Sequence, residues 1–184
     1  SSIQMVFQDP YASINPQKKI GWLLEEPLVI HHREMGKEER QHMVKRMLQV
    51  VGLDESYKDR YPGQLSGGQR QRVSIALALI LNPSFVVADE PVSALDVSVQ
   101  AQILNLMKRL QKEYGLTYLF ISHDLNVVSY MSDRIGVMYL GSIVEIGSQE
   151  EITWHARHPY TQALFSASAR EDGEKRERIV LKGD

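Results

Sequence analysis

The sequence predicts an α/β fold in which helices cover a parallel sheet. Two short apolar runs, over residues 85–88 and 118–121, each end in polar residues, as buried parallel strands with chemistry at their carboxyl ends do. Between them, residues 97–114 show the pattern of an amphipathic helix that stops at Gly115. Strand, helix and strand joined by short connections favour a parallel sheet.

The residues upstream of this unit are predicted to be mainly helical. Hydrophobic periodicity indicates one short strand and two helices, over residues 3–7, 18–31 and 37–51. Pro27 is expected to kink or break the first helix, and Gly52 to stop the second. After a polar connector, Ser66 and Gln69 form a capping-box pattern that opens a helix through residue 81. This helix is apolar on nearly all sides, so it should be buried.

The residues downstream are predicted to form a helix, a hairpin and a charged end. The helix is expected over residues 124–131, and the hairpin strands over residues 135–139 and 142–146, turning at Leu140 and Gly141. Ser148 and Glu151 form a second capping-box pattern. The charged stretch over residues 170–178 is expected to be a solvated connector or a frayed end.

Composition restricts the classes of function. The chain has 184 residues, a formal net charge of −2 and no cysteine. Without cysteine, disulfides, thiolate zinc sites and thiol catalysis are excluded, and the acidic balance gives no indication of a nucleic-acid binder. No apolar run is long enough to span a membrane, and the opening residues do not resemble a signal peptide, so we expect a cytoplasmic chain. An opening that lacks methionine and leads at once into a strand indicates a fragment.

Two acids and a histidine at strand ends are candidate catalytic residues. In phosphate-handling α/β enzymes, an aspartate in the position of Asp89 holds Mg²⁺, usually through water, and a glutamate beside it, here Glu90, can accept a proton from an attacking water. His123, at the end of the next strand, could donate a hydrogen bond to a γ-phosphate. The simpler interpretations are acids at an exposed strand end and a histidine that flanks a helix.

A glycine-rich segment is a candidate anion-binding site. In Ser66-Gly67-Gly68-Gln69, here called the glycine loop (residues 66–69), the glycines let backbone N–H groups approach an anion closely. The serine hydroxyl and the helix N-terminus add donors and positive potential. The loop could therefore hold a phosphate without a charged side chain, although a helix cap alone is the simpler interpretation.

These segments, taken together, resemble the motifs of ABC ATPases in order and spacing. The matches are to the Q-loop (residues 6–10), the ABC signature (65–73), Walker B with the catalytic glutamate (85–90), the D-loop (93–96) and the H-loop (His123). The resemblance covers residues 3 to about 168. It implies a partial P-loop NTPase (RecA-like) parallel sheet with the ABC helical subdomain, with the N-terminal strands and the P-loop missing.

The resemblance also implies ATP and Mg²⁺ as cofactors and a role for each matched residue. Glu90 would be the general base, Asp89 would assist Mg²⁺ binding, and His123 would touch the γ-phosphate. Gln8 would contact Mg²⁺ or the attacking water and relay movement to the membrane partner. The γ-phosphate of ATP on the opposite subunit would be bound by the glycine loop, Ser66, Gly67, Gly68 and Gln69. Asp96 would act across the dimer interface.

One motif that such an ATPase needs is missing from the sequence. No G-x-x-x-x-G-K-[ST] is present, and the nearest match, residues 63–68, is followed by Gln69 and Arg70 where lysine and serine or threonine should stand. In the family, this P-loop lies N-terminal to the Q-loop. We therefore expect this fragment alone to be inactive, and its sheet to expose apolar surface through which the chain could self-associate.

Less common details resemble the oligopeptide and dipeptide importers. They lie at residues 11–16, 93–100, 139–141 and 158–164. The implied partners are a second ATPase subunit in a homo- or heterodimer, transmembrane permease subunits and, indirectly, a substrate-binding protein, at the cytoplasmic face of the cell membrane and without nucleic acid. Nickel importers share much of this pattern, and a non-catalytic fragment that does not bind ATP alone is a further alternative.

Other classes of function fit less well. DNA-repair and chromosome-associated ABC ATPases carry long coiled coils or zinc modules between the Q-loop and the signature. Here the interval between these motifs covers only residues 8–65 and contains no cysteine. Translation-associated ABC proteins carry two cassettes. The histidines at positions 31, 32, 155 and 158 lack carboxylate or cysteine partners at metal-ligand spacing, which favours surface histidines over a metal site.

The predicted organisation has four segments. They are a Q-loop strand and turn (residues 1–16), a helical subdomain with the signature (17–82), an α/β core from Walker B to the H-loop (83–147), and C-terminal helices with a charged tail (148–184).

Overall fold

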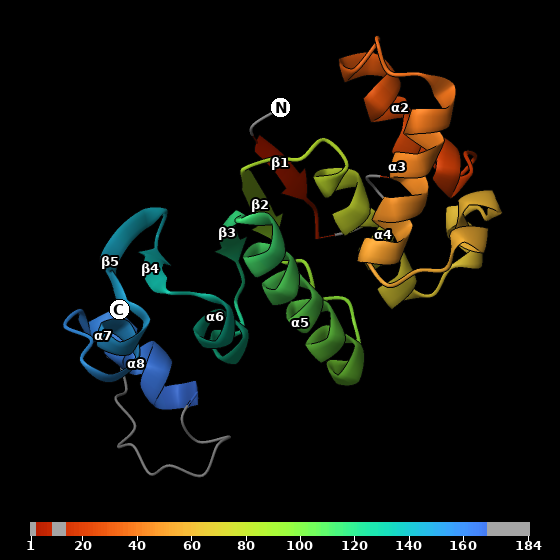
Figure 1. Cartoon of the computed structure of the whole chain (residues 1–184). Helices are drawn as coiled ribbons and strands as arrows, with labels where there is room; N and C mark the ends of the chain where they lie inside the picture. Colours follow the sequence, from red (N-terminus) through yellow and green to blue (C-terminus); the bar gives the residue numbers. More distant parts are fainter. Residues whose placement is uncertain (1–2, 9–13, 169–184) are drawn as a thin grey trace. The chain divides into compact units, whose positions relative to one another are not determined.

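The computed structural model describes residues 3–8 and 14–168 of the chain. These residues belong to two compact units, of which the first ends at Ile121 and the second begins at Ser122. Figure 1 shows the elements of both units, coloured along the sequence.

The first unit contains a three-stranded parallel sheet. Strand β2 (Phe85–Asp89) pairs on one side with β1 (Ile3–Val6) and on the other with β3 (Thr117–Ile121). The parallel register places Val6 beside Ala88, and Asp89 beside Ile121. The carboxyl ends of all three strands therefore meet at one edge of the sheet, as the predicted α/β class requires.

Four helices and two short 3-10 turns complete the first unit. They are α2 (Ile20–His31), α3 (Lys37–Val50), η1 (Glu55–Asp59), η2 (Pro62–Gln64), α4 (Gly67–Leu79) and α5 (Val97–Tyr114). Helix α4 contacts α2, α3, α5 and β1. Seven of its side chains are buried, including Val73, Ile75 and Ala76, which confirms the burial expected from its apolar sequence.

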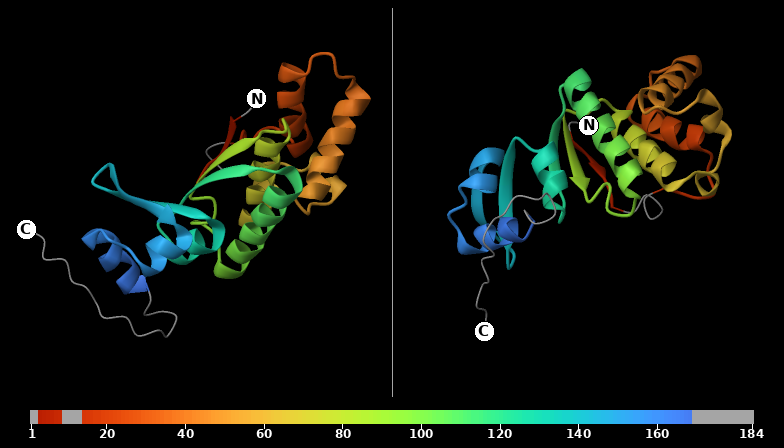
Figure 2. Two further views of the ribbon diagram at one scale, coloured as in Figure 1. Left: turned by 60° about the vertical axis from the view of Figure 1, so that its left-hand side comes forward. Right: turned by 90° about the horizontal axis from the view of Figure 1, so that it is seen from below.

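Within the described residues of the first unit, helices cover one face of the sheet. Val6, Val86 and Ala88 are buried on the face that the helices cover, and Figure 2 shows α4 and α5 on the same side of the strands. The opposite face is apolar but open, with the side chains of Leu119 and Ile121 exposed by 49% and 44%. The predicted burial of residues 118–121 is therefore wrong, because in the described part of the chain β3 is an edge strand with one covered face. The expected exposure of apolar sheet surface is confirmed.

The ends of the helices largely follow the sequence pattern. Helix α2 is not broken at Pro27 but continues to His31, because buried Leu24 and Leu28 anchor it on both sides of the proline. Gly52, with a φ of +75°, follows α3 at the predicted stop, in the left-handed region that glycine adopts without strain. Gly115, with a φ of +62°, ends α5 in the same way.

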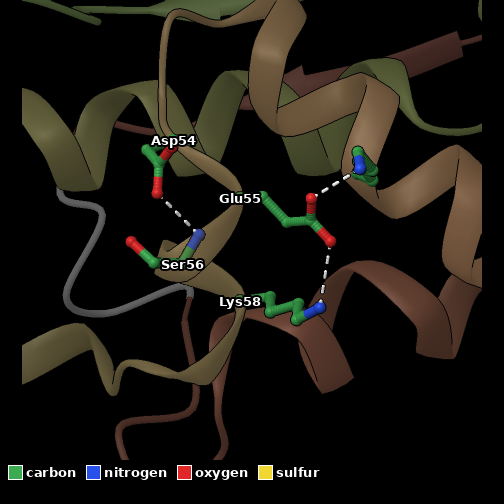
Figure 3. A network of polar contacts seen from close by, with 5 residues as sticks. Asp54, Glu55, Ser56 and Lys58 are labelled. Carbon is green, nitrogen blue, oxygen red and sulfur yellow. Dashed lines mark hydrogen bonds and ion pairs between the residues drawn. The ribbon is translucent and has the colours of Figure 1, made fainter.

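The connector between α3 and the glycine loop is more ordered than a polar linker. Asp54 begins η1 by accepting a hydrogen bond from the backbone N–H of Ser56, at 2.9 Å. The carboxylate of Glu55 lies 2.6 Å from the ammonium of Lys45 on α3 and 3.1 Å from that of Lys58 (Figure 3). The hydrogen bond from Lys45, followed by that from Lys58, holds the pKa of Glu55 below its ordinary value. This ion-pair network ties η1 to α3.

The second unit is built on an antiparallel hairpin. Strands β4 (Arg134–Tyr139) and β5 (Ser142–Ser148) join through Leu140 and Gly141, whose φ angles of +47° and +79° are those of a type I′ turn. Helices α6 (Leu125–Met131), α7 (Gln149–Trp154) and α8 (Pro159–Ser168) accompany it. The buried core joins the hairpin to α7 and α8 through Ile135, Val137, Ile152 and Phe165.

Three sequence predictions for this unit are confirmed and one lies outside the described residues. Helix α6 (Leu125–Met131) lies within the predicted residues 124–131. The hairpin turns where predicted, and the second capping box is present: Ser148 Oγ accepts from the N–H of Glu151 at 3.2 Å, and the Glu151 carboxylate accepts from the N–H of Ser148 at 2.8 Å. The charged stretch over residues 170–178 is not among the described residues.

The Glu55 network predicts a pH dependence of stability. Because the pKa of Glu55 is lowered in the folded chain, its ionised form stabilises the fold above its ordinary pKa of about 4.5, and this contribution is lost as the pH falls through the lower, folded value. We expect Glu55→Gln to lower the urea midpoint at pH 7 and to change it much less at pH 3. Equal shifts at both pH values would contradict the pairing.

Candidate functional site

The chain turns sharply where β2 ends. Asp89 is the last residue of the strand, and Glu90 follows it with a φ of +44°, in the left-handed region that costs a non-glycine residue about 1–3 kcal/mol. The backbone N–H of Glu90 donates to the carbonyl of Ile121 at 2.9 Å. This bond continues the pairing of β2 with β3 by one residue and offsets part of the strain.

The side chain of Glu90 is held from the neighbouring strand. Gln8 Nε2, two residues beyond the end of β1, donates to Glu90 Oε2 at 2.9 Å, although the two residues are 82 positions apart in the sequence. This bond uses one carboxylate oxygen as an acceptor and leaves the amide oxygen of Gln8 out of the contact. The parallel sheet thus brings together three of the predicted site residues, Gln8, Asp89 and Glu90.

The oxygen atoms at this strand edge suit a magnesium ion. The Asp89 carboxylate and the Gln8 amide oxygen are ligands of the hard, oxygen-preferring kind that Mg²⁺ takes, usually together with water and substrate phosphates. No cluster of three or more histidine, cysteine or acidic side chains exists in the part of the chain that the structure describes, so a metal here would need such outside ligands.

A short turn leads from Glu90 to α5. The backbone N–H and the hydroxyl of Ser93 both donate to the carbonyl of Glu90, at 3.3 and 3.1 Å, and the N–H of Leu95 donates to the carbonyl of Val92 at 3.1 Å. Asp96 then stands, exposed, at the N-cap position of α5 without a side-chain capping bond. Its carboxylate is therefore not required for capping.

The glycine loop forms the predicted capping box at the start of α4. Ser66 Oγ accepts from the N–H of Gln69 at 3.3 Å, and Gln69 Oε1 accepts from the N–H of Ser66 at 3.0 Å. The Ser66 side chain is exposed, and its own hydroxyl hydrogen takes no part in these two bonds. A donor hydroxyl at the N-terminus of a 13-residue helix suits an anion such as a phosphate.

The two glycines of the loop allow a close approach to the residues around Asp96. A Cβ atom placed on Gly67 would lie 3.2 Å from Leu95 Cδ2, and one placed on Gly68 would lie only 2.5 Å from Val99 Cγ1. The turn after Glu90 and the glycine loop therefore pack directly against each other. This packing gives the glycines a structural role beside any role in anion binding.

One contact of the glycine loop was missed by sequence reasoning. Gln69 Nε2 donates to the hydroxyl oxygen of Tyr57 at 2.8 Å. Tyr57 lies in η1, within the stretch predicted only as a polar connector, and no periodicity or spacing pattern relates it to Gln69. A tyrosine in a polar stretch next to a capping box is the sole signal that could have drawn attention to it.

His123 belongs to the second unit and is exposed there. It lies between Ser122, whose Oγ accepts from the N–H of Asp124 at 3.1 Å, and Asp124, whose carboxylate caps α6 by accepting from the N–H of Asn126 at 2.9 Å. These local bonds order the backbone on both sides of the imidazole. His123 thus stands where the strand-end prediction put it, immediately before a capped helix.

The arrangement in the first unit defines a class of protein. Acids and an amide at the carboxyl edge of a parallel sheet, together with a glycine loop at the N-terminus of a buried helix, are the features of phosphate-handling α/β proteins.

Comparison with known proteins identifies the family. The family model described as "ABC transporter" matches residues 2–93, which is half of the chain. The oligopeptide transport ATP-binding protein AppF of Bacillus subtilis (strain 168) is 54% identical over 100% of this chain and 56% of its own length. The dipeptide transport ATP-binding protein DppF of Escherichia coli (strain K12) is 56% identical over 99% of this chain and 54% of its own length. The chain belongs to the ABC transporter family, and it spans about half the length of the curated relatives that it matches.

Solved structures agree with this assignment. The ATP-binding cassette MJ0796, in a dimeric post-hydrolysis state bound to ADP and Pi, superposes with a TM-score of 0.70 at 35% identity, over 81% of this chain and 63% of that one. The protein cbiO1 from Clostridium perfringens, part of the ABC transporter complex cbiONQ, superposes with a TM-score of 0.75 at 30% identity, over 84% of this chain and 60% of that one. No helix in the described part of our chain is long and apolar enough to cross a membrane.

The contact between Gly68 and Val99 predicts a sensitive position. Gly68→Ala should lower the free energy of unfolding by about 1–2 kcal/mol, because the new methyl group collides with Val99 unless α4 or α5 shifts. Urea denaturation measures this change. Gly63→Ala, whose Cβ would meet nothing within 4 Å, is the matched control and should stay within about 0.5 kcal/mol of the parent.

The double variant Gly68→Ala with Val99→Ala makes room for the methyl group and should recover part of the loss. Equal effects of alanine at positions 63 and 68 would show that the close approach does not matter for stability.

Proposed function

We propose that the complete protein is the ATP-binding and ATP-hydrolysing subunit of an ABC importer that powers the uptake of oligopeptides or dipeptides. The observation that carries this proposal is the identity of 54–56% to oligopeptide and dipeptide transport ATP-binding proteins over practically the whole chain, the motifs included. Nickel importers have similar motifs, but both relatives compared above are named for peptides, so we place peptide uptake first.

In this proposal Glu90 is the general base. Its carboxylate accepts a proton as a water molecule attacks the γ-phosphate, and the hydrogen bond from Gln8 Nε2 to Oε2 supports the role by holding the carboxylate at the carboxyl edge of the sheet. Asp89, with the amide oxygen of Gln8, would hold Mg²⁺ and its waters; the ion, when bound, supplies charge neutralisation on the phosphates. The positive φ of Glu90 and the hydrogen bond from Gln8 occur together at this turn.

The glycine loop is proposed to serve a nucleotide held by a second subunit. The exposed Ser66 hydroxyl and the N–H groups of Gly67 and Gly68, at the N-terminus of α4, are donors for a γ-phosphate. Gln69 contributes by shaping the loop, since both polar atoms of its side chain are engaged within the chain. The similar MJ0796 cassette is dimeric in its solved structure, which supports a two-subunit arrangement.

Two further residues complete the proposed machinery. Asp96, exposed beside the glycine loop, would act across the interface between the two subunits. His123, exposed at the start of the second unit, would touch the γ-phosphate as a sensor of its presence. Neither side chain is buried, which is consistent with groups that meet a partner or a ligand.

The proposed setting is the cytoplasmic face of the cell membrane. The partners would be a second ATPase subunit, homo- or heterodimeric, the transmembrane permease subunits and, indirectly, a substrate-binding protein. In this setting residues 1–16 would form the Q-loop region and residues 17–82 the permease-facing helical subdomain with the signature. Residues 83–147 would form the catalytic core and residues 148–184 the C-terminal region.

The first test is ATP binding by the 184-residue chain alone. Because the sequence contains no P-loop motif, we expect calorimetry with Mg²⁺ to detect no binding up to millimolar ATP. Tight binding would mean that residues of this chain build the phosphate cradle, and the assignment of the glycine loop to a nucleotide on another subunit would have to be given up.

The second test concerns hydrolysis in the complete protein. Glu90→Gln should reduce ATP turnover by about 10²–10⁴-fold and make an ATP-bound dimer accumulate, because the amide cannot accept the proton. Turnover is measured by phosphate release and the dimer by size-exclusion chromatography. Glu113→Gln, at an exposed carboxylate on α5, is the control and should leave turnover unchanged. Unchanged turnover in Glu90→Gln would remove Glu90 from the base role.

A further inference from the structure

The side-chain amide of Gln69 is held at both of its ends. Its oxygen accepts from the N–H of Ser66 at 3.0 Å, and its nitrogen donates to the hydroxyl of Tyr57 at 2.8 Å. A backbone N–H can only donate, so the oxygen must face Ser66 and the nitrogen must face Tyr57. The amide of Gln69 thus connects the Tyr57 hydroxyl to Ser66, the first residue of the glycine loop.

The ring of Tyr57 is itself fixed in place. The guanidinium carbon of Arg60 lies 4.0 Å from the ring centroid, which is a close cation–π contact. The backbone N–H of Tyr57 donates to the carbonyl of Asp54 at 3.0 Å, inside η1. The hydroxyl therefore extends from a half-buried, stacked ring rather than from a rotating surface side chain.

The 3-10 turn that carries Tyr57 is anchored to two helices. The N–H of Ile20, at the start of α2, donates to the carbonyl of Arg60 at 2.9 Å. A Cβ on Gly21 would lie 3.0 Å from the carbonyl oxygen of Lys58, so the backbones of α2 and η1 touch there. The ion pair between Lys45 and Glu55 adds the third attachment, to α3 (Figure 3).

We propose that Tyr57 is a positioning residue for the signature: its hydroxyl, by holding Gln69, sets the geometry in which the glycine loop meets the γ-phosphate on a second subunit. This inference rests on the proposed function of the loop. Tyr57 touches neither nucleotide nor metal in it, and acts only through the Gln69 amide. The anchoring of η1 to α2 and α3 makes the hydroxyl a fixed reference point for the loop.

The hydroxyl should affect closure of the dimer more than nucleotide binding by one subunit. Under the proposed function, a subunit's own nucleotide is held by its P-loop, and the glycine loop engages only the nucleotide of the opposite subunit. Loss of one hydrogen bond that orients the loop should weaken ATP-driven dimerisation by about 3–10-fold. The ATP affinity of a single subunit should stay unchanged.

The experiment uses Tyr57→Phe in the complete protein carrying Glu90→Gln, with ATP as the probe. Phenylalanine keeps the ring that Arg60 covers and removes only the hydroxyl. The dimerisation constant is measured by analytical ultracentrifugation, and the ATP affinity of the monomer by calorimetry at low protein concentration. We expect the first to weaken by about 3–10-fold and the second to stay the same.

A matched control separates positioning from a general loss of stability. Ile75→Val removes a buried methylene from α4, the helix that also carries Gln69. We expect it to lower the free energy of unfolding about as much as Tyr57→Phe does, without changing the contacts of the Gln69 amide. It should leave the dimerisation constant unchanged.

Three results would overturn the inference. Dimerisation that is unchanged in Tyr57→Phe, or that weakens equally in Ile75→Val, removes the positioning role while the proposed function stands. If the Glu90→Gln parent forms no ATP-dependent dimer, the proposed function fails, and this inference fails with it.

Discussion

The parallel pairing of β2 with strands on both sides is the constraint on which the candidate site depends. Parallel strands end at the same edge, so residues that follow β1 and β2 meet there although most of the first unit lies between them in sequence. The contact from Gln8 to Glu90 and the bond from the Glu90 N–H to Ile121 both exist only in this register. A slip of one residue would turn Asp89 to the other face of the sheet.

Helix α4 is the second organising element, because it links the sheet to the helical part of the unit. Its body is buried against β1, α2, α3 and α5, while its N-terminus carries the glycine loop. The loop in turn packs on the residues that follow Glu90, through Gly67 with Leu95 and Gly68 with Val99. A displacement of α4 would therefore move the glycine loop and the turn after Glu90 together.

The sheet illustrates what a run of apolar residues leaves undecided. Residues 118–121 are continuous in hydrophobicity, which fits a strand covered on both faces, yet Leu119 and Ile121 are exposed and their neighbours are half-buried. Whether one or two faces are covered depends on which elements pack on them, and a strand's own sequence does not contain that information. Pro27 shows the same limit, since packing by buried leucines carries α2 past a residue that would disrupt an isolated helix.

The sequence by itself determined the local features of this protein: the two capping boxes, the turn at Leu140 and Gly141, the glycine helix ends and the strand–helix order. These features arise between residues a few positions apart, whose distances the backbone geometry sets directly. The motif residues at the strand ends were also identified from the sequence, because their order and spacing resemble a family. Only the tertiary structure decided that Gln8 reaches Glu90, that η1 is anchored to α2 and α3, and that Tyr57 holds Gln69. Such contacts join residues from separate elements, and their partners are chosen by the packing of those elements rather than by any local preference of the chain.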